Sequence, residues 1–395
     1  MYILISYYDS EPIRNVLSLL HAEYDAIYLL YAPTEGAPSK SERKRLGAFL
    51  SDRFAIEPEF VRVRGNTVES FLKKFEMLAA SDGRTEIDIA SGSSAFVAAA
   101  GIFLSEHPNT KVSLLRYSPR TDRMQVNYPN APEQRPRRKV LSVPDRIALS
   151  GTFFTHGDRD GILVRSERHD RELLTLWDAV KGKSAAWNRF CMLRASDTGT
   201  DAWQRRLTTV EEKKTANTIV PLLEKAGLIT DVRYSVENGR ERLTFLPNLL
   251  PENRELLQKA GSALERYAYL CAADAGLFSD VRTGVEIDWD GVASTGADNP
   301  YNEIDLILSY GNLIAFGSCK NREPNKEDLY EISVLTNHFG GRYAAALLLS
   351  TLPAPGPVAE RAKEMGVFVI DNIKGRSPHQ MAQRFAELVK KTERE

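Results

Sequence analysis

The stretch NEIDLILSYGNLIAFGSCK, residues 302–320, predicts two β-strands joined by a tight turn. Apolar and β-branched residues fill both arms, and Gly311-Asn312 between them is a favoured two-residue hairpin turn. A turn of that length pairs Tyr310 with Leu313 and fixes the register of the whole hairpin. A three-residue turn over Tyr310–Asn312 would instead shift every pair by one residue.

Two carboxylates, a serine and a lysine share one face of this hairpin. Counting back from the two-residue turn, Asp305 falls opposite Ser318. The same count places Glu303 opposite Lys320, and strand alternation puts all four side chains on one face. Two carboxylates can hold a hard divalent cation, and a lysine beside them can offset the charge of an attacked phosphate or help deprotonate the attacking water. The alternative interpretation is a surface hairpin with ordinary acidic and basic cross-strand pairs.

The order of these residues resembles that of the PD-(D/E)XK nucleases, whose core is a helix with a Glu, a strand with an Asp and a strand ending in (D/E)-x-K. By that resemblance, Glu265 is the helical acid, Asp305 the first strand acid and Lys320 the lysine. Ser318 stands where the family usually has its second acid, and Glu303 could take its place from the facing strand. The resemblance implies a Mg²⁺- or Mn²⁺-dependent nuclease whose metal ligands are Asp305, Glu303 and Glu265.

Without the family order, Glu265 is better interpreted as a solvated helix residue paired with Arg266 or Lys259. Glu331, on the next helix, is a weaker candidate, and His338 has no second His or Cys at metal-ligand spacing. The family order is therefore what singles out Glu265.

Residues 1–130 alternate strand-like apolar runs with amphipathic helical stretches, the pattern of an open, mostly parallel sheet with helices on both faces. Ligands of such sheets bind at the carboxyl ends of the strands, where helix N-termini attract phosphate. Two polar loops lie at such positions, Ser6–Pro12 and Asp88–Ser94. Neither matches the dinucleotide or P-loop fingerprint, and each could also be an ordinary strand-to-helix turn with good N-caps.

The expected strands are 2–6, 26–31, 59–63, 87–90 and 111–117, with helices at 11–21, 40–53, 67–80 and 94–106.

The layout of this half resembles the CRISPR-associated Rossmann-fold (CARF) sensor domain, which carries a polar loop after its first strand and a small-residue loop after its fourth. That family binds cyclic oligoadenylates across a two-fold homodimer. The resemblance implies cyclic tetra-adenylate as the allosteric activator, although Ala90–Ser94 lacks the lysine that relatives often have there. The implied ligand contacts are Tyr7, Asp9, Ser10, Ser91, Gly92, Ser93 and Ser94.

The expected domains are a sensor over 1–141, a helical, winged-helix-like segment over 142–250 and a nuclease over 251–395. Prolines and a basic run between Pro129 and Pro144 indicate an irregular boundary, the basic run being either a solvated linker or a nucleic-acid contact. A helix followed by a hairpin with Asn238-Gly239 at its turn is typical of a winged helix, as of many other folds. The expected fold class is therefore α/β, with a Rossmann-like parallel sheet, a mainly helical segment and a restriction-endonuclease-like domain.

With 43% hydrophobic and 27% charged residues, the 395-residue chain belongs with ordinary globular proteins. No apolar run approaches the roughly 20 residues of a membrane span, and no basic segment precedes the first strand, so we expect a cytoplasmic protein without membrane contact. The three cysteines are too far apart for a C-x-x-C metal site. A net charge of −1 means that nucleic-acid contacts must come from local basic patches.

Together these features favour a cyclic-oligoadenylate-activated, metal-dependent endonuclease of type III CRISPR antiviral defence that cleaves DNA, with RNA as a second candidate substrate. Two alternatives stay open: a ligand-responsive transcription regulator that uses the winged helix, and a constitutive repair or restriction nuclease whose N-terminal half only dimerises. A DNA-reading regulator has no need of Asp305 and Lys320. Ligand-dependent cleavage would separate the sensor nuclease from a constitutive one.

Overall fold

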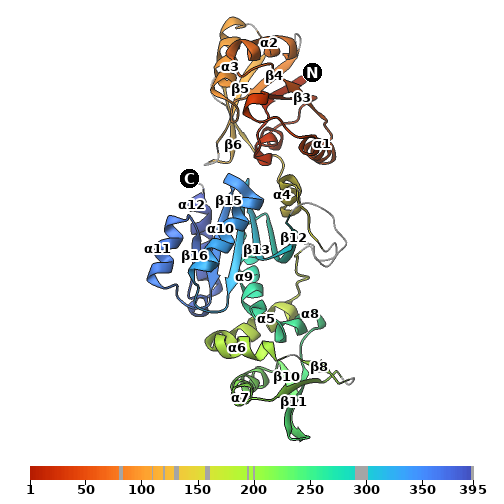
Figure 1. The fold of residues 1–395 in the computed structure, drawn as a ribbon, viewed down its shortest axis with the longest axis vertical. Helices are drawn as coiled ribbons and strands as arrows, with labels where there is room; N and C mark the ends of the chain where they lie inside the picture. Colours follow the sequence, from red (N-terminus) through yellow and green to blue (C-terminus); the bar gives the residue numbers. More distant parts are fainter. Residues whose placement is uncertain are drawn as a thin grey trace.

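The computed structural model describes residues 1–79, 83–108, 110–118, 121–128, 133–155, 161–193, 195–198, 201–289 and 301–392. Three sheets organise the molecule and lie one after another along its long axis (Figure 1). A seven-stranded sheet forms the N-terminal unit, a five-stranded sheet forms the C-terminal unit in the centre, and a four-stranded sheet forms the wing unit at the far end.

The N-terminal unit is an open sheet of order β3-β2-β1-β4-β5-β6-β7, in which the first five strands are parallel. Helix α1 packs on one face, and α2 and α3 pack on the other. The five predicted strands are present, but the predicted helix over 11–21 is two short 3₁₀ helices. The Asn15 side chain donates to the carbonyls of Asp9 and Pro12 and so competes with helical hydrogen bonding. The bounds are β1 (Tyr2–Tyr7), η1 (Pro12–Asn15), η2 (Ser18–Leu20), β2 (Ala26–Tyr31), η3 (Pro33–Glu35), α1 (Lys40–Phe54), β3 (Pro58–Arg62), α2 (Val68–Leu78), β4 (Arg84–Asp88), α3 (Ser94–Glu106), β5 (Val112–Ser118), β6 (Arg123–Tyr128) and β7 (Glu133–Pro136).

The proline-rich boundary contains a strand that the sequence did not suggest. Strand β7 pairs with β6 and forms the edge of the sheet, where the missing N–H of Pro136 is tolerated. The basic run is not a solvated linker at Arg135, which is buried and forms a 2.8 Å ion pair with the buried Glu86. Although burial alone raises the pKa of Glu86, hydrogen bonds from Arg135, Tyr2 and Tyr24 lower it. Because the prolines indicated an irregular boundary, the sequence did not predict this buried ion pair.

Helix α4 (Val143–Ser150) joins the N-terminal and C-terminal units. Its apolar side is buried in the same core as helix α10. Its buried Arg146 donates to the carbonyl of Asn312 at 2.7 Å and to that of Tyr343 at 3.3 Å. The start of the segment predicted to be winged-helix-like therefore packs with the C-terminal unit.

The wing unit combines three helices with an antiparallel sheet of order β10-β11-β9-β8. Helix α7 covers one face of this sheet, and the long hairpin β10–β11 turns at Asn238-Gly239, as predicted. The buried Arg205 donates to the carbonyls of Phe190 and Leu257, which ties the sheet to its neighbours. The bounds are α5 (Glu167–Val180), α6 (Ser184–Met192), β8 (Ser196–Asp197), β9 (Trp203–Leu207), α7 (Val210–Lys225), β10 (Ile229–Glu237) and β11 (Arg240–Pro247).

The C-terminal unit is a mixed sheet of order β12-β13-β14-β15-β16. Strands β12 to β14 form an antiparallel meander, and β15 and β16 continue parallel to β14. Helices α9 and α12 pack on one face and α10 and α11 on the other, so the expected α/β fold class is confirmed. The bounds are α8 (Pro251–Arg254), α9 (Ser262–Asp274), β12 (Asp280–Asp288), β13 (Tyr301–Tyr310), β14 (Leu313–Lys320), α10 (Lys326–Gly340), β15 (Ala344–Ser350), α11 (Gly356–Glu364), β16 (Phe368–Ile370) and α12 (Pro378–Thr392).

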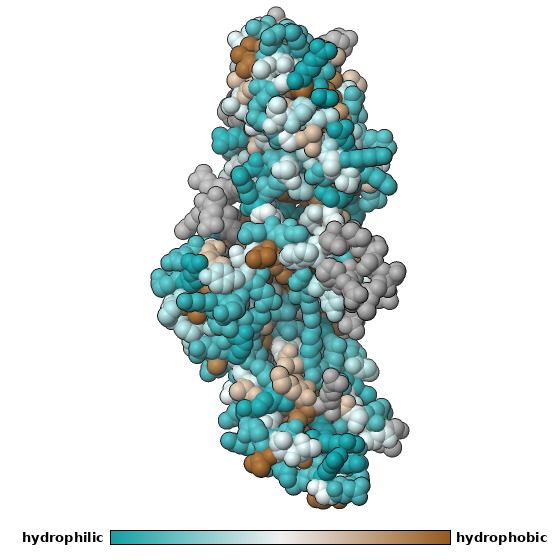
Figure 2. All heavy atoms as spheres, viewed as in Figure 1, coloured by the Kyte–Doolittle hydropathy of each residue, from teal (hydrophilic) through white to brown (hydrophobic). Residues whose placement is uncertain are grey.

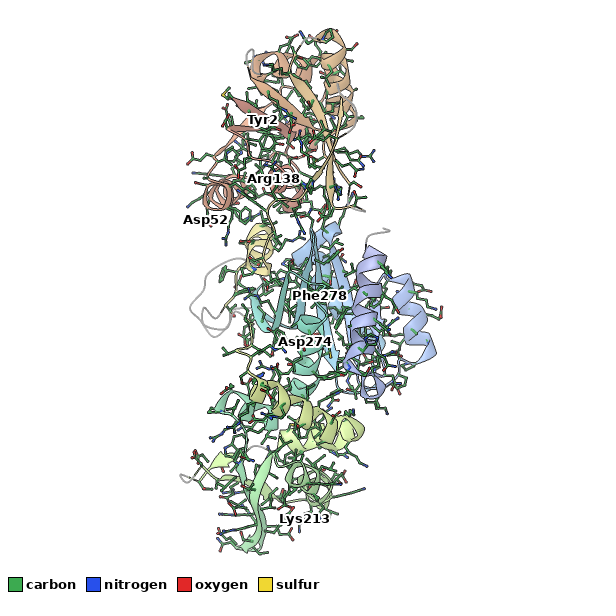
Figure 3. All side chains as sticks on the ribbon, turned by 180° about the vertical axis from the view of Figure 1, so that it is seen from behind. Tyr2, Asp52, Arg138, Lys213, Asp274 and Phe278 are labelled. Carbon is green, nitrogen blue, oxygen red and sulfur yellow. The ribbon has the colours of Figure 1, made fainter. Side chains whose placement is uncertain are left out.

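The surface of the described residues is mostly hydrophilic on the face that Figure 2 shows. From behind, side chains crowd all three units, with Tyr2 in the N-terminal unit, Phe278 in the C-terminal unit and Lys213 in the wing unit (Figure 3). Within the described ranges, no helix is both long and apolar enough to cross a membrane.

Candidate functional site

The hairpin β13–β14 has the register that the two-residue turn predicts. Tyr310 pairs with Leu313, and the ladder continues to Leu306 opposite Gly317, one residue before Asp305. Gly311 has φ +57°, which suits the first central position of a tight hairpin turn. Asp305 then accepts a 2.6 Å hydrogen bond from the backbone N–H of Cys319, so its carboxylate reaches β14 beside Ser318 and Lys320.

Helix α9 brings Glu265 to the same place from one face of the sheet. Glu265 is only 8% exposed, and its pKa is raised first by burial and then by the charge of Asp305. The pKa of Asp305 is likewise raised by burial. The interpretation of Glu265 as a solvated, paired residue is wrong, because Arg266 pairs with Glu255 and Lys259 pairs with Glu303.

Lys320 is held by helix α10. Its Nζ lies 3.3 Å from Glu331 Oε2 and 3.6 Å from Asp328 Oδ1. Asp328 is buried, accepts two 2.8 Å bonds from Arg322 and completes the N-terminal capping box of α10 with Asn325. Asp328 was not among the residues predicted from the sequence, although an Asn with an acid three residues later is a helix-start signal that could have located it.

Lys259, suggested by the sequence only as a partner of Glu265, is a further residue of this cluster. It forms an ion pair with Glu303 from the chain that leads into α9. Although burial alone lowers the pKa of Lys259, the hydrogen bond to Glu303 and the charge of Glu265 raise it. Lys259 therefore supplies positive charge to a group of three acids.

Two cavities meet at Glu303. The smaller, of about 50 Å³, is lined by the four hairpin residues that the sequence placed on one face, Glu303, Asp305, Ser318 and Lys320. The larger, of about 430 Å³, is lined by Glu265 and Lys259 and, on its other side, by residues of α5 and α8 such as His169 and Glu252. The catalytic candidates thus border both a tight polar recess and an open space beside the wing unit.

The acids supply the oxygen ligands that a divalent cation prefers, but the described residues do not form a closed coordination shell. Within the described parts of the chain, no three His, Cys, Asp or Glu side chains converge closely enough to form a ready metal site. Mg²⁺ commonly uses one or two carboxylates and completes its coordination with water and substrate oxygens. Glu265 and Asp305 are desolvated carboxylates whose raised pKa values a cation would reverse, so they suit that mode of binding.

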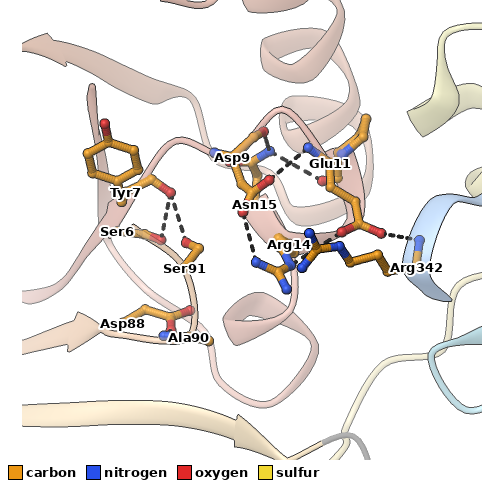
Figure 4. Close-up of polar contacts among 11 residues, drawn as sticks. Ser6, Tyr7, Asp9, Glu11, Arg14, Asn15, Asp88, Ala90, Ser91 and Arg342 are labelled. Carbon is orange, nitrogen blue, oxygen red and sulfur yellow. Dashed lines mark hydrogen bonds and ion pairs between the residues drawn. The ribbon is translucent and has the colours of Figure 1, made fainter. Parts of the chain in front are cut away.

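The loop after β1 is tied together by its own hydrogen bonds. Asp9 accepts from the backbone of Glu11 at 2.8 Å and from Arg14 at 3.1 Å, and its own N–H donates to Asn15 at 2.9 Å (Figure 4). The carbonyl of Tyr7 accepts from Ser91 at 3.1 Å, which joins this loop to the loop after β4. Two of the predicted ligand contacts, Tyr7 and Ser91, are therefore buried structural residues, whereas Asp9 and the exposed Ser10 lie nearer the surface.

The loop after β4 caps helix α3. Ser93 accepts the N–H of Phe96 at 3.2 Å, and Ser94 is exposed beside it. Gly92 has φ +105°, and a Cβ there would lie 2.8 Å from Phe96 and 2.9 Å from Tyr7. A bulky residue at Gly92 would disturb the sheet as well as any ligand, so it is no clean test of binding.

The loops after β2 and β3 contribute two residues that the sequence analysis missed. Asn66 accepts a 2.5 Å hydrogen bond from Ser93 and donates to Glu35, so loops after β2, β3 and β4 meet at the carboxyl edge of the sheet. The signal was available, because the carboxyl ends of all parallel strands lie on that edge.

Fold and site together define a class: an α/β protein in which a Rossmann-like parallel sheet is joined to a second α/β unit that carries clustered acids and a lysine. Solved structures share the whole architecture. Protein VC1899 from Vibrio cholerae is 19% identical with a TM-score of 0.71, over 99% of this chain and 98% of that one. Can2 from Sulfobacillus thermosulfidooxidans, solved in complex with cyclic tetra-adenylate, is 16% identical with a TM-score of 0.66, over 98% and 99%.

A third similar structure is a type III CRISPR defence DNA nuclease activated by cyclic oligoadenylate. It is 14% identical with a TM-score of 0.50, and the match covers 90% of this chain and 46% of that one. No protein-family model and no curated protein matches the chain. At these identities the likeness establishes the fold.

Proposed function

We propose that this chain is a metal-dependent endonuclease of type III CRISPR antiviral defence that cyclic tetra-adenylate activates. The observation that carries the proposal is the pair of carboxylates, the buried Glu265 and the half-buried Asp305, beside Lys320. Buried acids without a cation cost stability, and such groups cluster where chemistry needs them. The similar fold of a cyclic tetra-adenylate complex and of a cyclic-oligoadenylate-activated DNA nuclease supports the same assignment.

In this proposal Asp305, Glu303 and Glu265 hold Mg²⁺ or Mn²⁺, which when bound polarises the scissile phosphate and favours a hydroxide nucleophile. Lys320 lines the same recess as Asp305 and offsets the negative charge that grows on the attacked phosphate. Asp328 orients the Lys320 ammonium from α10. The substrate is DNA, with RNA as the second candidate.

The proposal includes a two-fold homodimer of N-terminal units with one cyclic tetra-adenylate on the axis. The surface of α3 supports this homodimer. The helix has no charged residue from Ser94 to Ser105, and its side chains Val97 and Ile102 are exposed. Two copies paired there would present the same helix N-termini to both halves of a symmetric ring. Calorimetry should give one cyclic tetra-adenylate per dimer, and one per protomer would contradict this geometry.

Activation needs a physical link between the units, and Glu11 offers one. Its backbone bonds to Asp9 in the loop after β1, and its carboxylate accepts the backbone N–H of Arg342 at 2.6 Å, just before β15 (Figure 4). A second link holds the catalytic hairpin, because Asn312 at its turn donates to Tyr117 at 2.8 Å. A ligand that binds one arrangement of these contacts better than another would shift the nuclease unit with it.

The catalytic assignment is tested by Asp305→Asn and Lys320→Ala. Each should lower ligand-activated cleavage at least about a hundredfold, because each removes a charge from the reacting centre. Folding and binding of cyclic tetra-adenylate should be unchanged by calorimetry. The exposed neighbours Glu327→Gln and Lys326→Ala serve as matched controls and should retain cleavage. Full cleavage by both catalytic variants would refute the site, and ligand-dependent DNA binding without cleavage would favour the transcription regulator.

A further inference from the structure

One face of the wing sheet gathers four arginines from three strands. Strand pairing places Arg206 of β9 directly opposite Arg242 of β11, and Arg242 opposite Ser235 of β10. Because side chains alternate along a strand, Arg240 shares this face with Arg242, and Arg233 shares it with Ser235. We call Arg206, Arg233, Arg240 and Arg242 the arginine face.

The opposite face of the same strands is the buried one. Leu243, Phe245 and Leu207 pack there in the core that α7 covers. The arginine face therefore points away from the helices of the wing unit, and three of its four members are exposed. Lys213 of α7 marks the covered side, where it forms an ion pair with Glu241 (Figure 3).

The charges of this face are poorly balanced within the chain. Along the paired residues 233–237, 240–244 and 204–206, the single acid on this face is Glu237, and it pairs with Arg242. Among the residues that the structure describes, no ion pair engages Arg206, Arg233 or Arg240. Like charges directly opposite each other on a sheet are destabilising, as Arg206 and Arg242 are here. A net charge of −1 for the chain means that this excess is local.

We propose that the arginine face binds the sugar-phosphate backbone of the nucleic acid that the nuclease cleaves, which rests on the proposed function. A guanidinium matches phosphate with paired donors, and arginines two residues apart on one strand are about 7 Å apart, which lets several contact one strand at once. The wing unit also borders the acids of the proposed catalytic site, because His169 of α5 lines the same cavity as Glu265. A substrate held on the wing would thus be kept near the reacting centre.

The test is binding without cleavage, using full-length Lys320→Ala protein in EDTA. Fluorescence anisotropy with single-stranded DNA, its duplex and RNA of the same sequence is measured from about 50 to 200 mM salt. Substitution of Arg206, Arg233 and Arg240 by Gln should raise the apparent Kd at least about tenfold and reduce the slope of log K against log salt by about 2 to 3. The matched control replaces three exposed cations elsewhere, Lys73, Arg171 and Lys363, by Gln and should change neither.

A lysine version of the arginine-face variant guards against misfolding. It keeps the charge, so it should keep most of the salt slope. Failure of the parent protein to bind any probe, an unchanged Kd in the Gln variant, equal loss in the control, or equal loss in the Lys variant would each overturn the proposal. An unchanged Kd would direct attention to an acidic protein partner instead. Because metal and the catalytic lysine are absent, failure here leaves ligand-activated cleavage by the wild-type chain as a separate test.

Discussion

The polar loop after β1 and the hairpin β13–β14 differ in how fully their acidic side chains are paired. In the loop, Asp9 is satisfied by a backbone N–H and by Arg14, and the loop holds its shape through its own bonds. In the hairpin, Asp305 has one backbone donor, and no described residue donates a hydrogen bond to Glu265 beside it. A self-satisfied loop can be preformed for a ligand, whereas the acids at the hairpin have few internal partners, as the proposed cation site would require.

Glu265→Gln tests whether Glu265 is a buried acid that lacks a compensating partner. A neutral amide removes the cost of a buried charge, so the metal-free variant should be more stable than the wild type by on the order of 2 kcal/mol above neutral pH. Because burial raises the folded-state pKa of Glu265, wild-type stability is lost as pH rises from about 4 through that raised pKa. The gain from the substitution should therefore shrink toward about pH 4. Thermal unfolding of both proteins across this range measures it.

Mn²⁺ provides the control for the same comparison. Added cation should stabilise the wild type more than Glu265→Gln, because only the wild type offers the charged carboxylate. Equal stability of the two metal-free proteins at every pH would show that the buried acid is already compensated.

Glu11→Gln tests whether the self-satisfied loop communicates with the hairpin. The amide still reaches the Arg342 N–H but loses the charge that pairs with Arg14 at 3.3 Å, so the link should weaken without loss of fold. We expect ligand-stimulated cleavage to fall about tenfold, which corresponds to about 1.4 kcal/mol of coupling. Cleavage without ligand and affinity for cyclic tetra-adenylate should stay close to wild type.

A matched acid elsewhere in the N-terminal unit controls for that change. Glu69, exposed on α2, forms an ion pair with Lys73 of the same helix, and Glu69→Gln should leave activation unchanged. Wild-type activation in Glu11→Gln would place the communication elsewhere, with the Asn312 contact as the next candidate.

Much of this architecture could be predicted because its signals are local. Gly311-Asn312 fixed a register that the structure reproduces, and period-two alternation then grouped Glu303, Asp305, Ser318 and Lys320. The parallel strands of the N-terminal unit were equally clear from their apolar runs. A local sequence pattern of this kind determines the geometry of its own strand or turn.

The missed features depend on contacts between distant segments. Lys259 gains its place only when α9 packs beside β13, and Arg135 only when β7 meets Glu86 across the sheet. Asp328 carried a local helix-start signal, but its approach to Lys320 depends on how α10 packs. The placement of Arg206 directly opposite Arg242 likewise follows only from the pairing of β9 with β11.

We expect a ligand in the N-terminal unit to turn on phosphodiester cleavage in the C-terminal unit. The most direct measurement incubates the wild-type chain with circular and linear DNA and with RNA in Mn²⁺, with and without cyclic tetra-adenylate. We predict cleavage that requires both the ligand and the metal and that stops when EDTA is added. Equal cleavage without the ligand, or no cleavage of any substrate with both present, would contradict the proposed function.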